Sequence, residues 1–187
     1  MKLIAITPPD FFPGEADAIC RLLDGKFWRV HIRKPGSESM QVEQLLNAIP
    51  RHYHSRLSLH DHFSLALRID IGGVHLNSRN PLVPEDWRGI VSRSCHSIEE
   101  LAQCRCNTAR RYDYLFVSPV FDSISKMGYH SAFNLEELRM SGIIDDRTVA
   151  LGGVTLSRLP LLAGAGFNMA AMLGAAWDDM DFPNYQS

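Results

Sequence analysis

A buried strand followed by two hydroxyls and an ammonium stands out in residues 112–126, YDYLFVSPVFDSISK. The apolar run Tyr114–Val117 is typical of a strand covered on both faces, as in a parallel sheet. Ser123, Ser125 and Lys126 follow it, at the carboxyl edge where α/β folds bind ligands. Two hydroxyl donors and a compact positive charge suit a phosphate or diphosphate. The alternative is a solvated loop with a surface lysine.

Polar side chains or glycines also follow most of the other strands that the sequence predicts. In a barrel of parallel strands these residues line one mouth, so their co-location is a stronger signal than any one of them. They are His31, Arg33 and Lys34; His60 and Asp61; His75 and Asn77; Ser94 and His96; Gly152 and Gly153; and Gly174.

Two of these residues carry charge that could bind a ligand or a metal. Arg33 offers a planar fork for a phosphate, and the alternative is a salt bridge on the rim. Asp61 is a candidate metal ligand, and the alternative is the N-cap of a helix expected from Phe63 onward. The sequence leaves both pairs of readings open.

The histidines at the strand ends suggest metal ligation at first sight. They come from different strands, however, and few carboxylates lie near them in the sequence. We therefore prefer substrate hydrogen bonding or core packing over a zinc site. The residues concerned are His31, His60, His75 and His96.

Glycines end the last two expected strands, Gly152-Gly153 after one and Gly174 after the other. Barrels of this kind often hold a phosphate at these two loops, where helix N-termini donate backbone N–H groups. Glycine allows the ligand to approach the backbone closely. The alternative is that these residues only make tight strand-to-helix turns.

The elements that must position these residues alternate regularly along the chain. Strands are expected at 3–7, 27–32, 56–59, 73–76, 90–94, 114–117, 148–151 and 168–173. Helices are expected at 15–23, 39–49, 63–69, 98–104, 134–140 and 156–163, with Ser39, Ser97 and Thr155 as N-caps. The pattern predicts a compact (β/α)₈ TIM barrel, one domain over residues 1–187, with a short or missing last helix.

Composition restricts the class of protein. A net charge of -2 and a pI of about 6.4 give no global field for nucleic acid. No apolar stretch is long enough to span a membrane, and the first residues, MKLIAIT, read as a strand instead of a signal peptide. The four cysteines form no CxxC pair and are read as reduced thiols of a cytoplasmic protein.

Several motifs recur in one order over nearly the whole chain. They are HIRKP from His31, the step His60-Asp61, GVHL from Gly73, SRSCHSIEE from Ser92, SPVFDSISK from Ser118, ALGGVT from Ala150, and a last strand that ends in glycine. Together they resemble the thiamine phosphate synthase family and its close relatives, the thiazole tautomerases. The resemblance implies a TIM barrel that joins an aminopyrimidine diphosphate to a thiazole phosphate with Mg²⁺ and releases diphosphate.

The resemblance also implies roles for individual residues. Arg33, Ser94 and Lys126 would contact the diphosphate as catalytic groups, helped by the hydroxyls of Ser123 and Ser125. Asp61 would bind Mg²⁺, with Asn80 at the position of the second metal ligand. Other substrate contacts are expected from His31, Lys34, His60, His75, His96, Gly152, Gly153 and Gly174.

The sequence departs from the family pattern at identifiable positions. His31 replaces a glutamine, His60 replaces an asparagine, and Asn80 replaces a metal-binding carboxylate. A lysine of the family falls on Pro35, one step after Lys34. Loss of a carboxylate should weaken the binding of Mg²⁺, which prefers charged oxygen ligands.

Three functions follow from these observations. The first is a thiamine phosphate synthase acting on small phosphorylated heterocycles. The second is a family member that binds or isomerises a thiazole phosphate. The tautomerases use a histidine after the sixth strand. This chain has Pro119 at that position, and the synthases also have a proline there. The third is a binding module on a barrel that has lost its activity. A homo-oligomer is left open, with a partner subunit covering the flank where the last helix is short.

Overall fold

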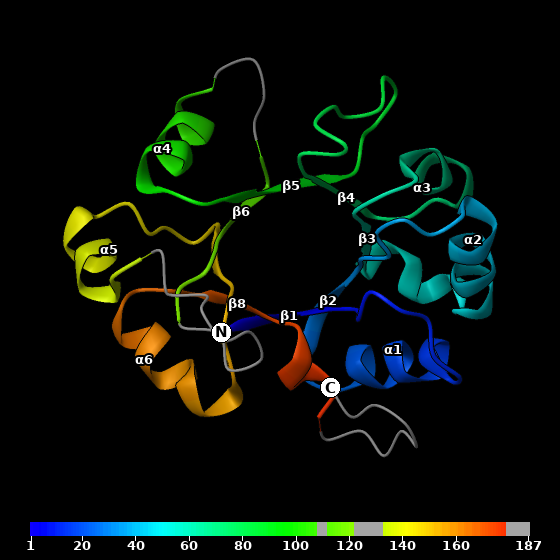
Figure 1. The fold of residues 1–187 in the computed structure, drawn as a ribbon, viewed down its shortest axis with the longest axis horizontal. Helices are drawn as coiled ribbons and strands as arrows, with labels where there is room; N and C mark the ends of the chain where they lie inside the picture. The colour runs from blue at the N-terminus through cyan, green and yellow to red at the C-terminus, as the bar shows by residue number, and fades with distance from the viewer. Residues whose placement is uncertain (108–111, 122–132, 179–187) are drawn as a thin grey trace.

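Eight parallel strands close into a barrel in chain order, β1 to β8, as Figure 1 shows. The structure is a computed structural model and describes residues 1–107, 112–121 and 133–178. The strands are β1 Lys2–Ile6, β2 Phe27–Ile32, β3 Leu57–Leu59, β4 Gly73–Leu76, β5 Ile90–Cys95, β6 Tyr114–Val117, β7 Thr148–Ala150 and β8 Met169–Met172. β1 pairs with both β2 and β8, so the sheet has no open edge. The predicted (β/α)₈ barrel is confirmed.

Helices surround this ring of strands (Figure 1). They are α1 Glu15–Asp24, α2 Ser39–Ala48, α3 Phe63–Ile69, α4 Ile98–Cys106, α5 Leu135–Ser141 and α6 Leu159–Gly164, with 3₁₀ helices η1 Arg51–Arg56 and η2 Leu156–Arg158. No helix joins β4 to β5 in residues 77–89, all of which the structure describes. The parallel strands therefore end at one mouth, where the connecting loops meet.

The helix starts show which expected caps the backbone uses. Ser97 accepts a hydrogen bond from Glu100 N at 3.0 Å, as expected, although the Glu100 carboxylate reaches His96 N at 2.8 Å instead of closing a reciprocal box. Ser39 was expected to cap α2, but Glu38 is the N-cap, with a capping box to Gln41. Thr155 stands at the N-cap position of η2, the 3₁₀ turn that precedes α6, but makes no side-chain cap bond.

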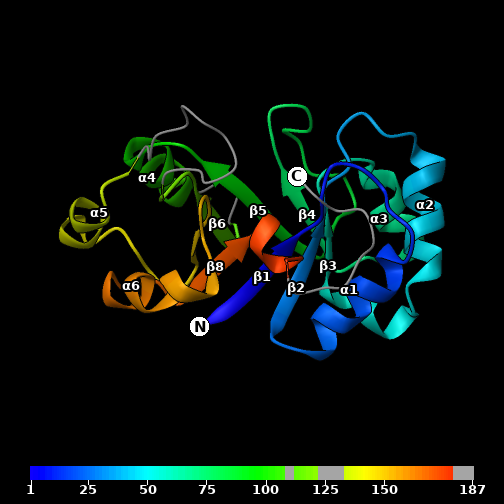
Figure 2. The same cartoon turned by 60° about the horizontal axis from the view of Figure 1, so that its bottom comes forward.

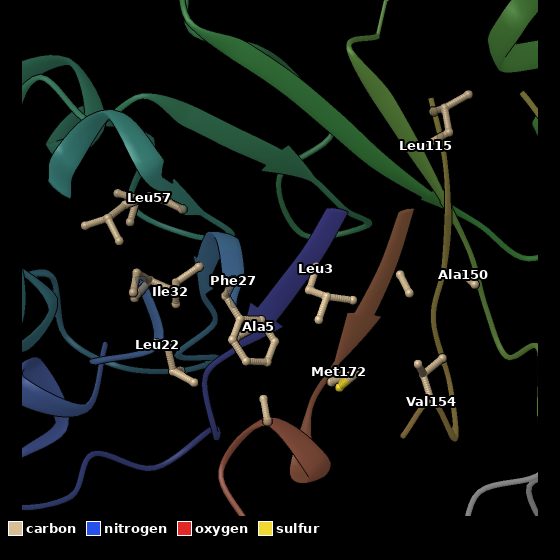
Figure 3. Close-up of a cluster of buried hydrophobic side chains, with 14 of the residues drawn as sticks. Leu3, Ala5, Leu22, Phe27, Ile32, Leu57, Leu115, Ala150, Val154 and Met172 are labelled. Carbon is tan, nitrogen blue, oxygen red and sulfur yellow. The ribbon is translucent and has the colours of Figure 1, made fainter. Parts of the chain in front are cut away.

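The main hydrophobic core lies between the strands and the helices. Outward-facing residues of the strands pack there against the apolar faces of the helices. Figure 3 shows part of this layer, with Leu22 of α1 beside Phe27 and Ile32 of β2. Cys95 and Cys104 are buried in this core and, like Cys20 and Cys106, are free thiols.

After β8, the described residues hold only a short 3₁₀ helix, η3 Gly174–Ala176. Figure 2 shows this turn, in red, beside β1. Trp177 fixes it there, because its Nε1 donates to Ile6 O at 2.8 Å and its ring meets Phe12 edge-on. The prediction of a short or missing last helix is confirmed. Among the described helices, none has the length and apolar character that a bilayer crossing needs.

The inside of the barrel is apolar on one side and polar on the other. The apolar side is built by β1, β6, β7 and β8 and contains Ile4, Ile6, Tyr114, Phe116, Val149, Met169 and Ala171. The polar side is built by β2 to β5, whose inward residues include Arg29, His31, Ser58, His60, His75 and Ser92, all buried. This division places the polar chemistry beside only four of the eight strands.

Candidate functional site

Hydrogen bonds join Tyr114, His31 and His60 into a chain that runs toward the mouth. The Tyr114 hydroxyl lies 2.7 Å from His31 Nε2, and His31 Nδ1 lies 2.9 Å from His60 Nε2. Arg29 Nη1 donates to Ser58 Oγ at 3.1 Å, and Ser58 hydrogen-bonds Tyr114. One assignment of the hydrogens that satisfies these contacts has Ser58 donate to Tyr114, Tyr114 donate to His31, and His31 donate to His60. This order leaves the hydrogen of His60 on Nδ1.

A second branch joins His75 to two serines of β5. His75 Nδ1 lies 2.9 Å from Ser92 Oγ, and its Nε2 lies 3.0 Å from Ser94 Oγ. The His75 ring stacks on His60 with the centroids 4.2 Å apart. The network therefore reaches the rim at two points, His60 and Ser94.

The three histidines are held neutral. Burial, reinforced by the positive charge of neighbouring groups, lowers the pKa of His31 and of His60 well below the ordinary value. Burial alone lowers the pKa of His75 to about 3. Removing an imidazolium from water costs more than the surrounding dipoles return, so the neutral ring is favoured near pH 7.

The same histidines meet one criterion for a metal site, since their ring nitrogens lie within 4.8 Å of one another. However, both nitrogens of His31 and both of His75 already have hydrogen-bond partners. The rings of His60 and His75 are also nearly parallel, at 23°. Their in-plane lone pairs do not converge on one point, as a tetrahedral site requires. This geometry supports our preference for hydrogen bonding and packing over zinc.

Asp61, just beyond β3, is engaged by the loop that follows β4. Arg79 donates two hydrogen bonds to the Asp61 carboxylate, from Nε to Oδ1 and from Nη2 to Oδ2, both 3.1 Å long. Asn80 Nδ2 donates to Asp61 Oδ1 at 2.9 Å and to His60 O at 3.1 Å. The expected alternative of an N-cap does not apply, because His62 is the N-cap of α3.

These contacts do not fit the expected magnesium ligands. A Mg²⁺ site needs several oxygen atoms turned toward one point. Both oxygens of Asp61 face Arg79, and Asn80 turns its NH₂ group, not its oxygen, toward Asp61. Asp61 and Asn80 are therefore neighbours, as the sequence led us to expect, but they are arranged as an ion pair with an amide donor.

Lys34 does not reach the mouth, contrary to expectation. Its ammonium lies 2.6 Å from Glu15 Oε1 and donates to the carbonyls of Pro8 and Asp10 at 2.9 and 2.7 Å. The side chains of Lys34 and Glu15 are 1% and 2% exposed. Lys34 is thus a structural cation that ties the β1–α1 loop to the end of β2, and we remove it from the substrate-binding set.

Arg33 lies at the rim, and its backbone is fixed by Thr7, whose Oγ1 accepts from Arg33 N at 2.9 Å. Within the described ranges no ion pair holds its guanidinium, so the alternative of a rim salt bridge finds no support there. His96 is exposed, with Nδ1 2.9 Å from Ser118 O. It lies outside the buried histidine network.

The glycine turns after β7 and β8 differ from each other. Gly152 and Gly153 have φ of 97° and 60°, and a Cβ on Gly152 would lie 2.6 Å from Pro119 Cβ. Only glycine fits there without strain. A Cβ on Gly174 would meet nothing within 4 Å. Gly152 therefore serves the tight packing of the turn on Pro119, whereas the surface at Gly174 is open.

Three residues expected at the diphosphate, Ser123, Ser125 and Lys126, lie outside the described residues. Asn77 was expected at the end of a strand, but the Tyr114 hydroxyl, Ser92 and Arg79 were not foreseen as groups of the site. Period-two alternation gave a signal for Ser92, because Ser92 and Ser94 share one face of a strand. Arg79 lies in an irregular loop, where no such period applies.

Comparisons with known proteins identify the family. A family model described as thiamine monophosphate synthase matches residues 3–176. The thiamine-phosphate synthase of Photorhabdus laumondii is 28% identical over 168 residues, which are 84% of this chain and 76% of that protein. The thiamine-phosphate synthase of Synechococcus sp. strain CC9605 is 31% identical over 150 residues. The match takes in 77% of this chain but only 42% of that longer relative.

Solved structures show the same relation. A thiamine phosphate pyrophosphorylase from Bacteroides thetaiotaomicron superposes with a TM-score of 0.83 at 39% identity, covering 99% of this chain and 90% of that one. A thiamine phosphate pyrophosphorylase from Pyrococcus furiosus, at 21% identity and a TM-score of 0.69, shares the fold.

Proposed function

Because the chain belongs to the thiamine monophosphate synthase family, we propose that it joins an aminopyrimidine diphosphate to a thiazole phosphate, giving thiamine phosphate and diphosphate. The agreement of the family model with synthases in both comparisons favours this function over thiazole isomerisation or a binding module without activity. The substrates are small phosphorylated heterocycles.

The reaction that we propose has two bond changes. The bond between the pyrimidine methylene carbon and the diphosphate oxygen breaks, and its electron pair leaves with the diphosphate. The lone pair of the thiazole nitrogen then forms the new C–N bond to the methylene cation. Negative charge develops on the leaving group and positive charge on the pyrimidine, so fixed charges and dipoles are the main catalytic resource.

The observation that carries the proposal is the gathering of cationic and hydroxyl side chains at one rim of the barrel. Arg33 follows β2, Ser94 ends β5, and Arg79 lies in the loop after β4. Arg79 pairs with Asp61, the residue after His60, and Arg33 follows β2, the strand that pairs with β3. The positive charges of both arginines contribute to lowering the pKa of His60, after burial and the neighbouring histidines. In our proposal this rim receives the diphosphate, and Ser123, Ser125 and Lys126 complete the set.

The neutral histidines suit the other half of the reaction. A pyrimidine cation beside an imidazolium would be destabilised by like charge, whereas a neutral ring adds only its dipole and its π face. In the proposed complex the Nδ1–H of His60 donates to a ring nitrogen of the aminopyrimidine. His31 and Tyr114 act as positioning residues, since their hydrogen bonds fix the tautomer of His60.

The thiazole phosphate is assigned to the loops after β7 and β8. Gly152 and Gly153 adopt a positive φ, and Gly174 begins η3 with open space around its Cα. Backbone N–H groups in such turns bind phosphate without a side chain. His96, exposed at the end of β5, is retained in the substrate-binding set of this proposal.

The residues expected to bind magnesium do not form a metal site in this structure. The family is generally Mg²⁺-dependent, but Asp61 and Asn80 do not present the ligand pair that the resemblance implies. The proposed reaction is therefore derived without a step through a metal.

The test is synthesis of thiamine phosphate by the purified protein from the two substrates, followed as thiochrome fluorescence after oxidation. Arg33→Ala should lower kcat/KM by about 100-fold or more, because it removes a charged donor from the leaving group. Arg51→Ala, at an exposed position of η1, is the matched control and should leave the rate unchanged. Failure to form product under any metal condition would reject the synthase function.

A further inference from the structure

The ion pair between Arg79 and Asp61 occupies the place where the family resemblance implies a metal ion. Its two contacts are both 3.1 Å long, which is the parallel fork that a guanidinium makes with a carboxylate. Asn80 adds a donor to the same carboxylate at 2.9 Å. Asp61 thus already has its cation, and that cation is part of the chain.

Local charge leads to the same conclusion. Two carboxylates with one divalent cation sum to zero. In this chain Asn80 is neutral, and Asp61 with Arg79 also sums to zero. The loss of a carboxylate and the presence of an arginine beside it therefore leave the net charge of the occupied site unchanged without any ion.

The loop holds Arg79 in position before a ligand arrives. Asn77 Oδ1 accepts from Arg79 N at 3.0 Å and from Asn80 N at 3.1 Å, and Asn77 Nδ2 donates to His60 O at 2.7 Å. The backbone of Arg79 is fixed by Asn77 and its guanidinium by Asp61. Little side-chain entropy remains to be lost when an anion binds.

Arg79 also has donors to spare. Its contacts with Asp61 use the Nε hydrogen and one Nη2 hydrogen of the five that a guanidinium carries. In the described part of the chain no hydrogen bond uses Nη1, and the side chain is 46% exposed. Asp61, which holds this guanidinium, directly follows His60, and Asn77 and Asn80 on either side of Arg79 both donate to His60 O. A phosphoryl oxygen can bind two of the remaining donors.

We infer that the Arg79 guanidinium, held on Asp61, supplies to the diphosphate the positive charge that a magnesium ion would supply, so that the chain binds diphosphate without a divalent cation. The inference rests on the proposed function for its substrate. It assigns to Arg79 a direct contact with the leaving diphosphate and to Asp61, Asn77 and Asn80 the positioning of that arginine.

Calorimetry with inorganic pyrophosphate in the presence of EDTA tests the inference. The wild type should bind pyrophosphate with EDTA about as tightly as with Mg²⁺. Arg79→Gln should weaken binding in EDTA by about tenfold to 100-fold, the usual range for one charge-assisted contact. Arg68→Gln is the matched control, because Arg68 pairs with Glu43 at 2.8 Å on the outer surface of α3. It should bind within about twofold of the wild type.

A second variant guards against an uninformative loss of binding. The double change Arg79→Gln with Asn80→Asp restores two carboxylates and removes the cation. It should bind pyrophosphate weakly in EDTA and regain binding when Mg²⁺ is added. Binding by the wild type only when Mg²⁺ is present, with Arg79→Gln unaffected, would overturn the inference.

Thiamine phosphate synthesis separates this inference from the proposed function. Synthesis that occurs only with Mg²⁺ would reject the role of Arg79 and keep the synthase. Arg79-dependent binding of pyrophosphate in EDTA, without synthesis under any condition, would keep the role of Arg79 and reject the synthase.

Discussion

The buried histidine network should make the protein acid-sensitive, and His75 gives the effect a size. Its ring is 2% exposed and bonded to Ser92 and Ser94, and burial lowers its pKa to about 3. In the unfolded chain an ordinary histidine has a pKa near 6.5. Above pH 6.5 both states are neutral, so His75 adds no pH dependence there. Below pH 6.5 the unfolded chain takes up a proton that the folded chain refuses.

The magnitude follows from this linkage. At pH 5 the unfolded state gains RT ln(1 + 10^1.5), which is about 2 kcal/mol. His75 should therefore lower the free energy of unfolding by about 2 kcal/mol as the pH falls from 8 to 5. With a urea slope of about 2 kcal/mol/M, that is a midpoint shift of about 1 M.

Urea unfolding of the wild type and of His75→Asn at pH 8, 6.5 and 5 measures the effect. The variant is less stable at pH 8, since it loses packing and hydrogen bonds. The difference in free energy of unfolding between the wild type and the variant should be smaller by about 2 kcal/mol at pH 5. His52→Asn, at an exposed position of η1, should keep the pH dependence of the wild type. A difference in free energy of unfolding between the wild type and His75→Asn that stays constant from pH 8 to pH 5 would refute the reasoning. An NMR titration of the His75 ring with a midpoint above pH 5 would also refute it.

Two further changes test the packing around the mouth. Lys34→Met should lower the free energy of unfolding by about 3–5 kcal/mol, because it leaves the buried Glu15 carboxylate unpaired. Adding Glu15→Gln should recover most of the thermal stability. The double variant should still bind pyrophosphate. Loss of pyrophosphate binding in that folded double variant would return Lys34 to the site. In urea unfolding, Gly152→Ala should lower the free energy of unfolding by several kcal/mol, because the new Cβ combines a positive φ with a 2.6 Å contact to Pro119. Gly36→Ala, at a φ of 75° with open space around the Cα, should lower it by about 1–2 kcal/mol. Equal losses at the two glycines would contradict the steric argument.

Much of the fold could be predicted because its signals are local. The strands Phe27–Ile32, Gly73–Leu76 and Tyr114–Val117 and the helix Phe63–Ile69 were predicted with the bounds that the structure has. Their limits are set by apolar runs and turn residues within a few positions. The 3₁₀ turns η1 and η2 were not predicted, because short 3₁₀ segments carry no distinct period.

The site was predictable only in part, because its contacts join residues distant in sequence. Lys34 illustrates the limit: alternation places it on the face opposite Arg33, and Glu15, 19 positions earlier, decides its role. The Arg79–Asp61 pair likewise depends on how the loop after β4 turns back over β3. Tyr114 was read as an apolar strand residue, and only the barrel geometry brings its hydroxyl to His31.

The central claim is that the mouth of the barrel between β2 and β5 receives the diphosphate. A crystal structure of the protein soaked with thiamine phosphate and pyrophosphate, in EDTA, tests it most directly. We expect pyrophosphate density within hydrogen-bond distance of the guanidinium groups of Arg33 and Arg79 and of Ser94 Oγ. Density for pyrophosphate elsewhere on the barrel, with this rim holding only solvent, would contradict the claim.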